Sequence, residues 1–237
     1  MAYDAVMPDG LSHAETLATV PLFAGLAPAA LVDVANSLVA RRFRRGEVIF
    51  HQGDPGNALF IVESGVVKIS LPSEAGEEAI LATLQAGEFF GELALLDGAP
   101  RSATAVAMEP SRMLVLARDR FRALLAEASI RDALLIGVAK ELRRLTIHVE
   151  ELHFLDIAGR LAARLAHLAG EGGTRLADGA LRLDLPLTQS DLAAMVGCTR
   201  QSVNKLLGQF ADDGLIRLDR DAVVVMDLER LIRFSRR

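Results

Sequence analysis

Short apolar runs separated by turn-forming residues dominate the first half of the chain. The runs occupy residues 48–50, 59–62, 66–71, 79–84, 103–106 and 113–116. The turn signals between them include Gly46, Gly65 and the stretches 53–56, 74–76 and 97–100. Many short strands broken by glycine and proline at intervals of about 8–12 residues are typical of a β-sandwich or barrel. We therefore predict a β-domain from about Val39 to Ala117, preceded by a helical pattern at 28–38.

A different period begins near Asp119. Apolar residues then recur in alternating steps of three and four, at Leu135, Val138, Leu142, Leu145, Val149 and Leu152. This heptad seam is narrow and is flanked by charges, which fits a partner helix better than a broad globular core. We predict a dimerisation helix. The alternative is a long helix that lies on its own domain. After 154–156 a second amphipathic helix follows, with Leu161, Leu165 and Leu168 on one face, and ends at Gly170.

Two short helices joined at a glycine are predicted near the C-terminus. Thr188 caps the first helix, and Asp191 three residues later completes a capping box. Gly197 permits the left-handed backbone of a tight turn, and Thr199 caps the second helix. The apolar positions are Leu192, Ala193, Val196, Val203, Leu206, Leu207 and Phe210, with Gly214 closing the second helix. This is the pattern of a helix-turn-helix, whose second helix enters the major groove of DNA.

The outward side of the second helix carries Arg200, Gln201, Asn204 and Lys205. Arginine and lysine can contact guanine, glutamine and asparagine can pair with adenine, and both cations can bind phosphate. Thr199 and Ser202 are expected to contact phosphate or to cap the helix. Residues 215–218 and 222–226 then predict two strands around 219–221, which would form a β-hairpin wing. An ordinary helical hairpin with a polar face would not account for this combination.

A second polar constellation lies in the predicted β-domain. Gly91 allows backbone N–H groups to approach a ligand closely, and Glu92 could accept a hydrogen bond from a ribose hydroxyl. Arg101 supplies a charge-assisted donor for phosphate, and Ser102 supplies a hydroxyl. Together they indicate a pocket for a small anionic molecule.

Composition and charge narrow the class of protein. The chain has 237 residues and a net charge of −5, yet residues 157–237 carry 12 basic and 10 acidic side chains. No apolar run approaches the roughly 18–20 residues of a membrane span. The N-terminus has Asp4 and Asp9 and no basic segment, so we expect no secretory signal and a cytoplasmic location. No metal-binding carboxylate cluster, nucleophile–base pair or phosphate-binding GxxxxGK[ST] loop indicates an enzyme.

Three stretches resemble the CRP/FNR family of bacterial transcription regulators. FGELALLDGAPRSATAVA resembles the phosphate-binding cassette of cyclic-nucleotide-binding domains, and VGCTRQSVNKLLGQFADDGLI resembles the family's winged helix-turn-helix. FLDIAGRLAARLAHLA resembles the segment that links the dimerisation helix to the DNA-binding domain. The resemblance implies an α+β fold with a jelly-roll-like β-roll at 1–118, a dimerisation helix and hinge at 119–156 and a winged helix-turn-helix at 157–237.

The resemblance also assigns roles to individual residues. The ligand-binding positions fall on Gly91, Glu92, Leu93, Arg101, Ser102, Ala103, Leu145 and Thr146, with Glu92 on the ribose and Arg101 and Ser102 on the cyclic phosphate. Leu145 and Thr146 occupy the pair that usually contacts adenine through hydroxyl or amide groups, and Leu145 departs from that pattern. Arg200, Gln201 and Lys205 fall on the DNA-reading positions. Gln201 stands where cAMP-responsive members usually have glutamate, which implies a changed base preference.

The effector is cAMP in the leading hypothesis. Alternatives are cGMP, a cyclic dinucleotide, another small anion such as a 2-oxo acid, or activity without a ligand. An iron–sulfur cluster is excluded because Cys198 is the one cysteine. His51, His148, His153 and His167 have no spacing that indicates haem, and no metal is expected. The implied partners are a second copy of the chain, a pseudo-palindromic DNA duplex and RNA polymerase, with no membrane.

Overall fold

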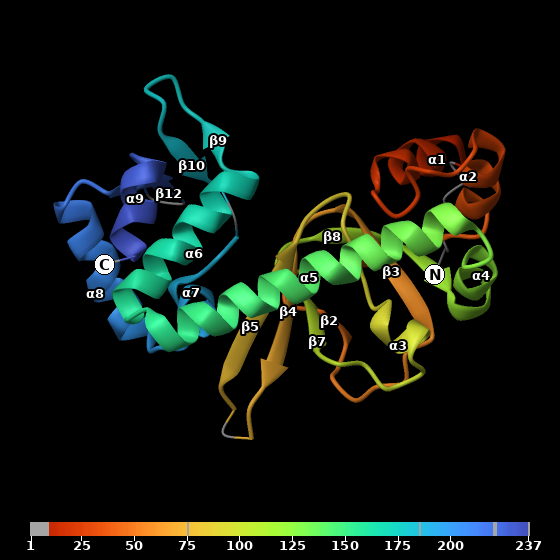
Figure 1. Cartoon of the computed structure of the whole chain (residues 1–237), viewed down its shortest axis with the longest axis horizontal. Helices are drawn as coiled ribbons and strands as arrows, with labels where there is room; N and C mark the ends of the chain where they lie inside the picture. Colours follow the sequence, from red (N-terminus) through yellow and green to blue (C-terminus); the bar gives the residue numbers. More distant parts are fainter. Residues whose placement is uncertain (1–9, 75, 185, 220–221, 237) are drawn as a thin grey trace, which may run out of the picture. The chain divides into compact units, whose positions relative to one another are not determined.

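The computed structural model describes residues 10–74, 76–184, 186–219 and 222–236 (Figure 1). Asp4, Asp9, Ala75, Arg220 and Asp221, named in the sequence analysis, lie outside the described residues. By its internal contacts the chain divides into two units, residues 1–71 with 81–141 and residues 72–80 with 142–237. Within the described residues, no helix combines the length and apolar character needed to cross a bilayer. The functional boundaries expected at residues 118 and 156 stay predictions.

The first unit is built on two four-stranded antiparallel sheets. One sheet has the order β1-β8-β3-β6 and the other the order β2-β7-β4-β5. The strands of the first sheet are β1 (Val39–Phe43), β8 (Ser111–Ala117), β3 (Ala58–Ser64) and β6 (Phe89–Phe90). Those of the second are β2 (Val48–Phe50), β7 (Thr104–Ala107), β4 (Val67–Pro72) and β5 (Glu78–Leu84). The tip of the β4–β5 hairpin groups with the second unit.

Strand β3 is buried on both faces, which explains its continuous apolar run. Phe60 and Val62 belong to a core shared by strands of both sheets. Leu59 and Ile61 point the other way, because successive side chains of a strand face opposite sides. They join a second core with side chains of five helices, α1 (Gly10–Thr19), α2 (Pro28–Ala35), α3 (Leu93–Leu96), α4 (Arg118–Leu124) and the first turns of α5 (Ala128–Phe154).

Several elements of this unit, among them β1 and α1, were not among the predicted runs. Strand β1 carries Arg41 and Arg42 and lies at the edge of its sheet, so four of its five residues are exposed and show no apolar alternation. Helix α1 has no acidic first turn and no basic last turn. Its burial comes from tertiary contacts of Leu17 with the sheet and the neighbouring helices, which a local pattern does not reveal.

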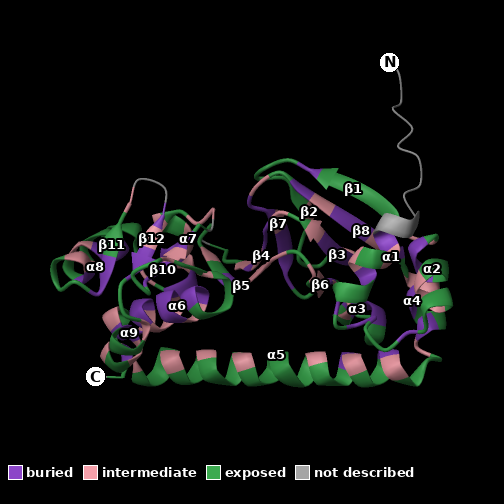
Figure 2. Ribbon diagram, turned by 90° about the horizontal axis from the view of Figure 1, so that it is seen from above, coloured by how far each residue is buried: buried purple, intermediate pink, exposed green. Residues whose placement is uncertain are grey.

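Helix α5 is continuous for 27 residues. Its buried residues are Ile130 and Leu134 within the described part of the chain, and Figure 2 shows the rest of the helix in the exposed and intermediate colours. All six members of the heptad seam are exposed in the single chain, from 38% at Leu145 to 69% at Leu135.

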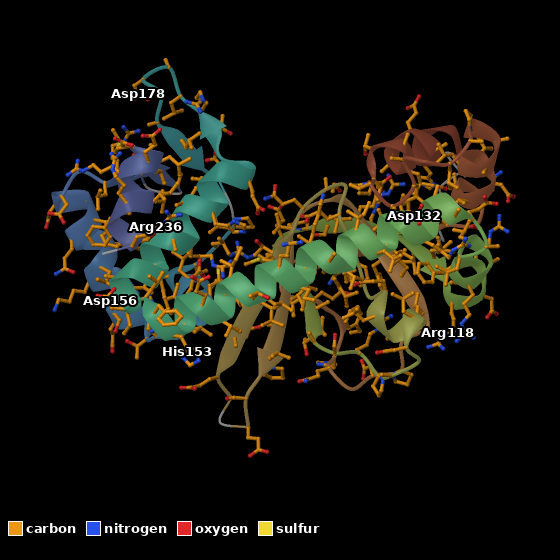
Figure 3. All side chains as sticks on the ribbon, in the orientation of Figure 1. Arg118, Asp132, His153, Asp156, Asp178 and Arg236 are labelled. Atoms are coloured by element: carbon orange, nitrogen blue, oxygen red, sulfur yellow. The ribbon has the colours of Figure 1, made fainter. Side chains whose placement is uncertain are left out.

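The second unit continues from α5 into α6 (Ile157–Gly172). Asp156 caps α6, and its Oδ1 accepts from the Gly159 amide at 2.7 Å (Figure 3). The remaining helices are α7 (Gln189–Val196), α8 (Arg200–Asp212) and α9 (Leu228–Ser235). A sheet of order β11-β12-β10-β9 is formed by β9 (Thr174–Arg175), β10 (Leu181–Leu183), β11 (Ile216–Leu218) and β12 (Val223–Val225). The expected α+β organisation, with a β-rich N-terminal part, a long helix and a C-terminal helix-turn-helix, is confirmed.

Candidate functional site

Arg101 is the most buried charged side chain of the predicted cassette, with an exposed fraction of 4%. Its Nη1 donates to the Gly91 carbonyl and its Nη2 to the Ala58 carbonyl, each at 2.7 Å. The guanidinium lies 4.2 Å from the ring centroid of Phe50, a cation–π distance. Its Nε is buried and has no hydrogen-bond partner in the described structure. This cation is therefore fixed by carbonyls and an aromatic face, and its Nε donor is left without an acceptor from the described residues.

The backbone beside Arg101 is shaped by a glycine. Gly91 has φ of +85°, and a Cβ built there would collide with the Arg101 Nη1 atom. Any other residue would therefore meet both backbone strain and the guanidinium. Gly91 leads directly into α3 (Leu93–Leu96), for which Glu92 is the residue before the first turn. The turn thus sets Glu92 and Arg101 in one neighbourhood.

Burial and the charge of Arg101 shift the pKa of the Glu92 carboxyl in opposite directions. Burial is the largest influence and raises the pKa of Glu92, and the Glu141 carboxylate raises it further. A backbone hydrogen bond and the positive charge of Arg101 lower it but do not cancel the rise. Burial in turn lowers the pKa of Arg101, while Glu92 favours its charged form. A ligand that donates a hydroxyl to Glu92 and offers an anion to Arg101 would compensate both desolvated charges.

The other expected cassette residues lie around this pair in different environments. Ser102 is exposed, Leu93 is 42% exposed, and Ala103 is buried at 6%. Arg118, labelled in Figure 3, lies outside the expected set and donates to the Gly56 and Ala94 carbonyls, the latter at 3.1 Å. It ties the loop before β3 to helix α3. Sequence reasoning missed the Ala58 carbonyl, the Phe50 ring and Arg118, because each acts through a fold-dependent approach of distant segments.

Leu145 and Thr146 lie on the part of α5 that belongs to the second unit. The cassette residues Gly91, Glu92 and Arg101 belong to the first unit. The Thr146 hydroxyl donates to the Leu142 carbonyl one turn earlier, at 2.9 Å. Its oxygen keeps its acceptor capacity.

The helix-turn-helix has the local chemistry expected from its sequence. The Thr188 hydroxyl accepts from the Asp191 amide at 3.1 Å, and the Asp191 carboxylate accepts from the Thr188 amide at 2.8 Å. Gly197 has φ of +69° and adopts the left-handed conformation at the end of α7. The Thr199 hydroxyl then accepts from the Ser202 amide at 3.1 Å and caps α8. Thr199 thus serves as the cap of α8, and the Ser202 hydroxyl lies within hydrogen-bond distance of the Thr199 hydroxyl at 3.0 Å.

The outward side of α8 is exposed at all four expected reading positions, Arg200, Gln201, Asn204 and Lys205. No ion pair is recorded for Arg200 or Lys205 within the described part of the chain. The Asn204 Oδ1 accepts from the Gln189 Nε2 of α7 at 3.1 Å. This bond occupies one acceptor position of the Asn204 carbonyl and links the two helices. Val203, Leu207 and Phe210 on the opposite side are buried, so the helix is held by its apolar face.

Among the described residues, no group of three or more histidine, cysteine, aspartate or glutamate side chains is placed to hold a metal ion. Cys198 is half-buried in the turn before α8, and burial raises the pKa of its thiol.

Comparison with known proteins finds a family match for each of two parts of the chain. Residues 40–128 match the family described as a cyclic nucleotide-binding domain, and residues 159–234 match the Crp-like helix-turn-helix domain. The chain is 38% identical over 223 residues to a CRP-like cAMP-activated global transcriptional regulator of Mycobacterium tuberculosis, covering 94% of this chain and 99% of that one. It is 36% identical over 209 residues to a cyclic AMP receptor protein of Thermus thermophilus, covering 87% and 93%.

A solved structure described as the c-di-GMP responsive global regulator CLP of Xanthomonas campestris superimposes with a TM-score of 0.70 at 25% identity, covering 81% of this chain and 95% of that one. A cyclic nucleotide-binding domain followed by a long helix and a helix-turn-helix defines a class of DNA-binding transcription regulators rather than enzymes. Within that class, the chain belongs to the CRP/FNR family.

Proposed function

We propose that the protein is a homodimeric transcription regulator whose binding to DNA is controlled by cAMP. The observation that carries the effector assignment is Arg101, a buried guanidinium with an unpartnered Nε beside Gly91 and Glu92. A cyclic phosphate would supply the missing acceptor and the compensating charge. The ribose hydroxyl would donate to Glu92, and Leu93, Ser102 and Ala103 complete the proposed phosphate site.

A cyclic dinucleotide is the second candidate effector. Leu145 favours it, because an apolar side chain stands where cAMP-responsive members usually carry a group that hydrogen-bonds adenine. Thr146 keeps such a group, which supports cAMP. The similar proteins include examples of both effectors, since one regulator is described as activated by cAMP and another as responsive to c-di-GMP.

Calorimetric titration of the full chain with cAMP, cGMP and c-di-GMP separates these effectors. We expect saturable binding of cAMP that Arg101→Ala weakens strongly. If the chain binds c-di-GMP and neither cAMP nor cGMP, the effector is c-di-GMP and the assignment of cAMP is wrong. The absence of binding by all three would refute control by a cyclic nucleotide.

The exposed heptad seam supports the dimer. Six apolar side chains along one line of α5 face solvent in the single chain, and a second copy of the same helix would bury them by knobs-into-holes packing. A two-fold dimer carries two recognition helices and requires a pseudo-palindromic site with half-site centres about one helical turn apart. In this proposal Arg200, Gln201, Asn204 and Lys205 read the groove, and Thr199 and Ser202 approach phosphate.

The ligand can act only through a difference in its affinity for the DNA-competent and incompetent states. We assign the change to the hinge at 154–156, where α5 ends and Asp156 starts α6, with functional domains at 1–118, 119–156 and 157–237. The regulator would work in the cytoplasm, where it meets chromosomal DNA and RNA polymerase.

A further inference from the structure

Four ionic side chains in or beside the sheet of the second unit form one connected group. Arg182 of β10 and Arg217 of β11 both lie opposite Val224 of the intervening strand β12. Residues that lie directly opposite one another across strands have their side chains on the same face of the sheet. The two arginines therefore flank Val224, which is 0% exposed, on one face.

Asp219, the first residue after β11, joins the two arginines. Its Oδ1 accepts from the Arg217 Nε at 3.1 Å, and its Oδ2 accepts from the Arg182 Nη1 at 3.1 Å. Arg182 also pairs through its Nε with Asp184 at 2.6 Å. The four side chains carry two positive and two negative charges, so this group, which joins the wing to β10, has no net charge.

This neutral wing contrasts with the recognition helix. No acidic residue occurs from 192 to 211, and no ion pair is recorded for Arg200 and Lys205 in the residues that the structure describes. The hydrogen bond from Arg217 lowers the pKa of Asp219, in keeping with a charged carboxylate between the two arginines. Arg200 and Lys205 on α8 are thus exposed cations with no acidic residue nearby in the sequence of their helix.

We propose that Asp219 limits the sequence-independent part of DNA binding by holding Arg182 and Arg217 in ion pairs and away from phosphate. Contacts to phosphate raise affinity for every sequence and carry no base information. A wing with unpaired arginines would therefore strengthen binding to any duplex. The recognition helix then supplies most of the affinity, and it does so where its side chains meet the right bases. The proposal rests on DNA binding by the helix-turn-helix and adds to it the role of a single carboxylate.

The test compares Asp219→Asn with Glu229→Gln, which makes the same charge change on α9, where Glu229 pairs with the exposed Arg233. Fluorescence anisotropy of the full chain, with and without cAMP, is measured against an operator selected in vitro and a scrambled duplex over a range of KCl. We expect Asp219→Asn to bind the scrambled duplex about tenfold more tightly at ~0.1 M salt, with a salt slope steeper by about one to two. The affinity of Asp219→Asn for the operator should increase by no more than its affinity for the scrambled duplex. Glu229→Gln should leave the affinity for both duplexes unchanged.

Arg217→Gln, combined with Asp219→Asn, completes a double-mutant cycle. The cycle distinguishes a specific effect of Asp219 on Arg217 from a general loss of folding. In the wild-type background Arg217→Gln should change affinity for the scrambled duplex less than twofold, and in the Asp219→Asn background it should reverse most of the gain. Weaker binding by Asp219→Asn to both duplexes at an unchanged melting temperature would overturn the proposal, because Asp219 would then hold the arginines in a DNA-contacting pose. So would equal gains in Asp219→Asn and Glu229→Gln. Failure of the wild type to bind any duplex would instead contradict DNA binding itself.

Discussion

The Arg101 guanidinium donates to the carbonyl of Gly91 at 2.7 Å, across ten residues of sequence. This bond closes the loop that contains α3 and places the buried cation at the start of the turn that precedes Glu92. The second bond of Arg101, to Ala58, anchors the same group to strand β3. The proposed phosphate site is therefore held by the sandwich in the ligand-free chain, so little ordering of Arg101 would be needed on binding.

Replacing Arg101 with alanine should weaken cAMP binding by roughly ten- to a hundredfold, because a charge-assisted bond of about 1.5–3 kcal/mol is lost. The change also leaves the Ala58 and Gly91 carbonyls without their donor, so the melting temperature should fall. Arg101→Lys keeps the positive charge but loses the planar guanidinium with its several N–H donors, and should bind cAMP with intermediate affinity. Calorimetry checks both variants, and wild-type affinity in Arg101→Ala would place the ligand elsewhere.

Glu92 should make stability and ligand binding respond oppositely to pH. Because burial raises its pKa in the folded protein, Glu92 favours the folded state below its unfolded value of about 4.3, and that contribution is lost as pH rises through the folded pKa. As the pH rises above about 4.3, the free energy of unfolding of Glu92→Gln should therefore decline less than that of the wild type. Urea titrations over the mildly acidic range measure this.

Binding of cAMP should tighten as Glu92 loses its proton, since the carboxylate accepts the ribose hydroxyl. Glu92→Gln should bind more weakly and lose this pH dependence. Glu127→Gln, which changes an exposed carboxylate of the same unit, is the control and should keep both profiles. Identical pH profiles for Glu92→Gln and the wild type would contradict the assigned role.

Leu142→Glu should convert the dimer to monomers. Leu142 is 64% exposed in the single chain and central in the seam, so the dimer would bury two like charges at this position. Lys140→Glu introduces the same side chain on α5 outside the seam and should leave the dimer intact. Sedimentation equilibrium distinguishes the two outcomes, and an unchanged dimer in Leu142→Glu would remove the seam from the interface.

Leu145→Thr should raise the preference for cAMP over cGMP, because it restores a hydroxyl at the position that the family uses for adenine. Competition binding with the two nucleotides measures the ratio of affinities. An unchanged ratio would show that this position does not read the base.

The sequence predicts best where a local rule governs the structure. Thr188 and Asp191 form the expected capping box, Gly197 has the expected left-handed backbone, and Thr199 caps α8. It predicts less where partners come from distant segments. The Ala58 carbonyl lies 43 residues before Arg101 in the chain, and nothing in either local pattern indicates that they meet.

The same limit applies to the wing. Two strands around residues 219–221 were expected, and β11 and β12 are found there. The ion pair between Arg182 and Asp219 depends on β12 lying between β10 and β11, which is a property of the sheet order. A charge count of the C-terminal part does not show which of its cations are already paired.

The most direct test of a cAMP-controlled DNA reader is the affinity of the full chain for a selected operator and a scrambled duplex, with and without cAMP. We expect cAMP to tighten operator binding by roughly 5- to 150-fold, the usual range of allosteric coupling. Arg101→Ala should lose this response. Arg200→Ala should lose about 1–3 kcal/mol at the operator and relax one base position per half-site, with cAMP affinity unchanged. Equally tight binding to both duplexes, independent of cAMP and undiminished in Arg200→Ala, would contradict the account.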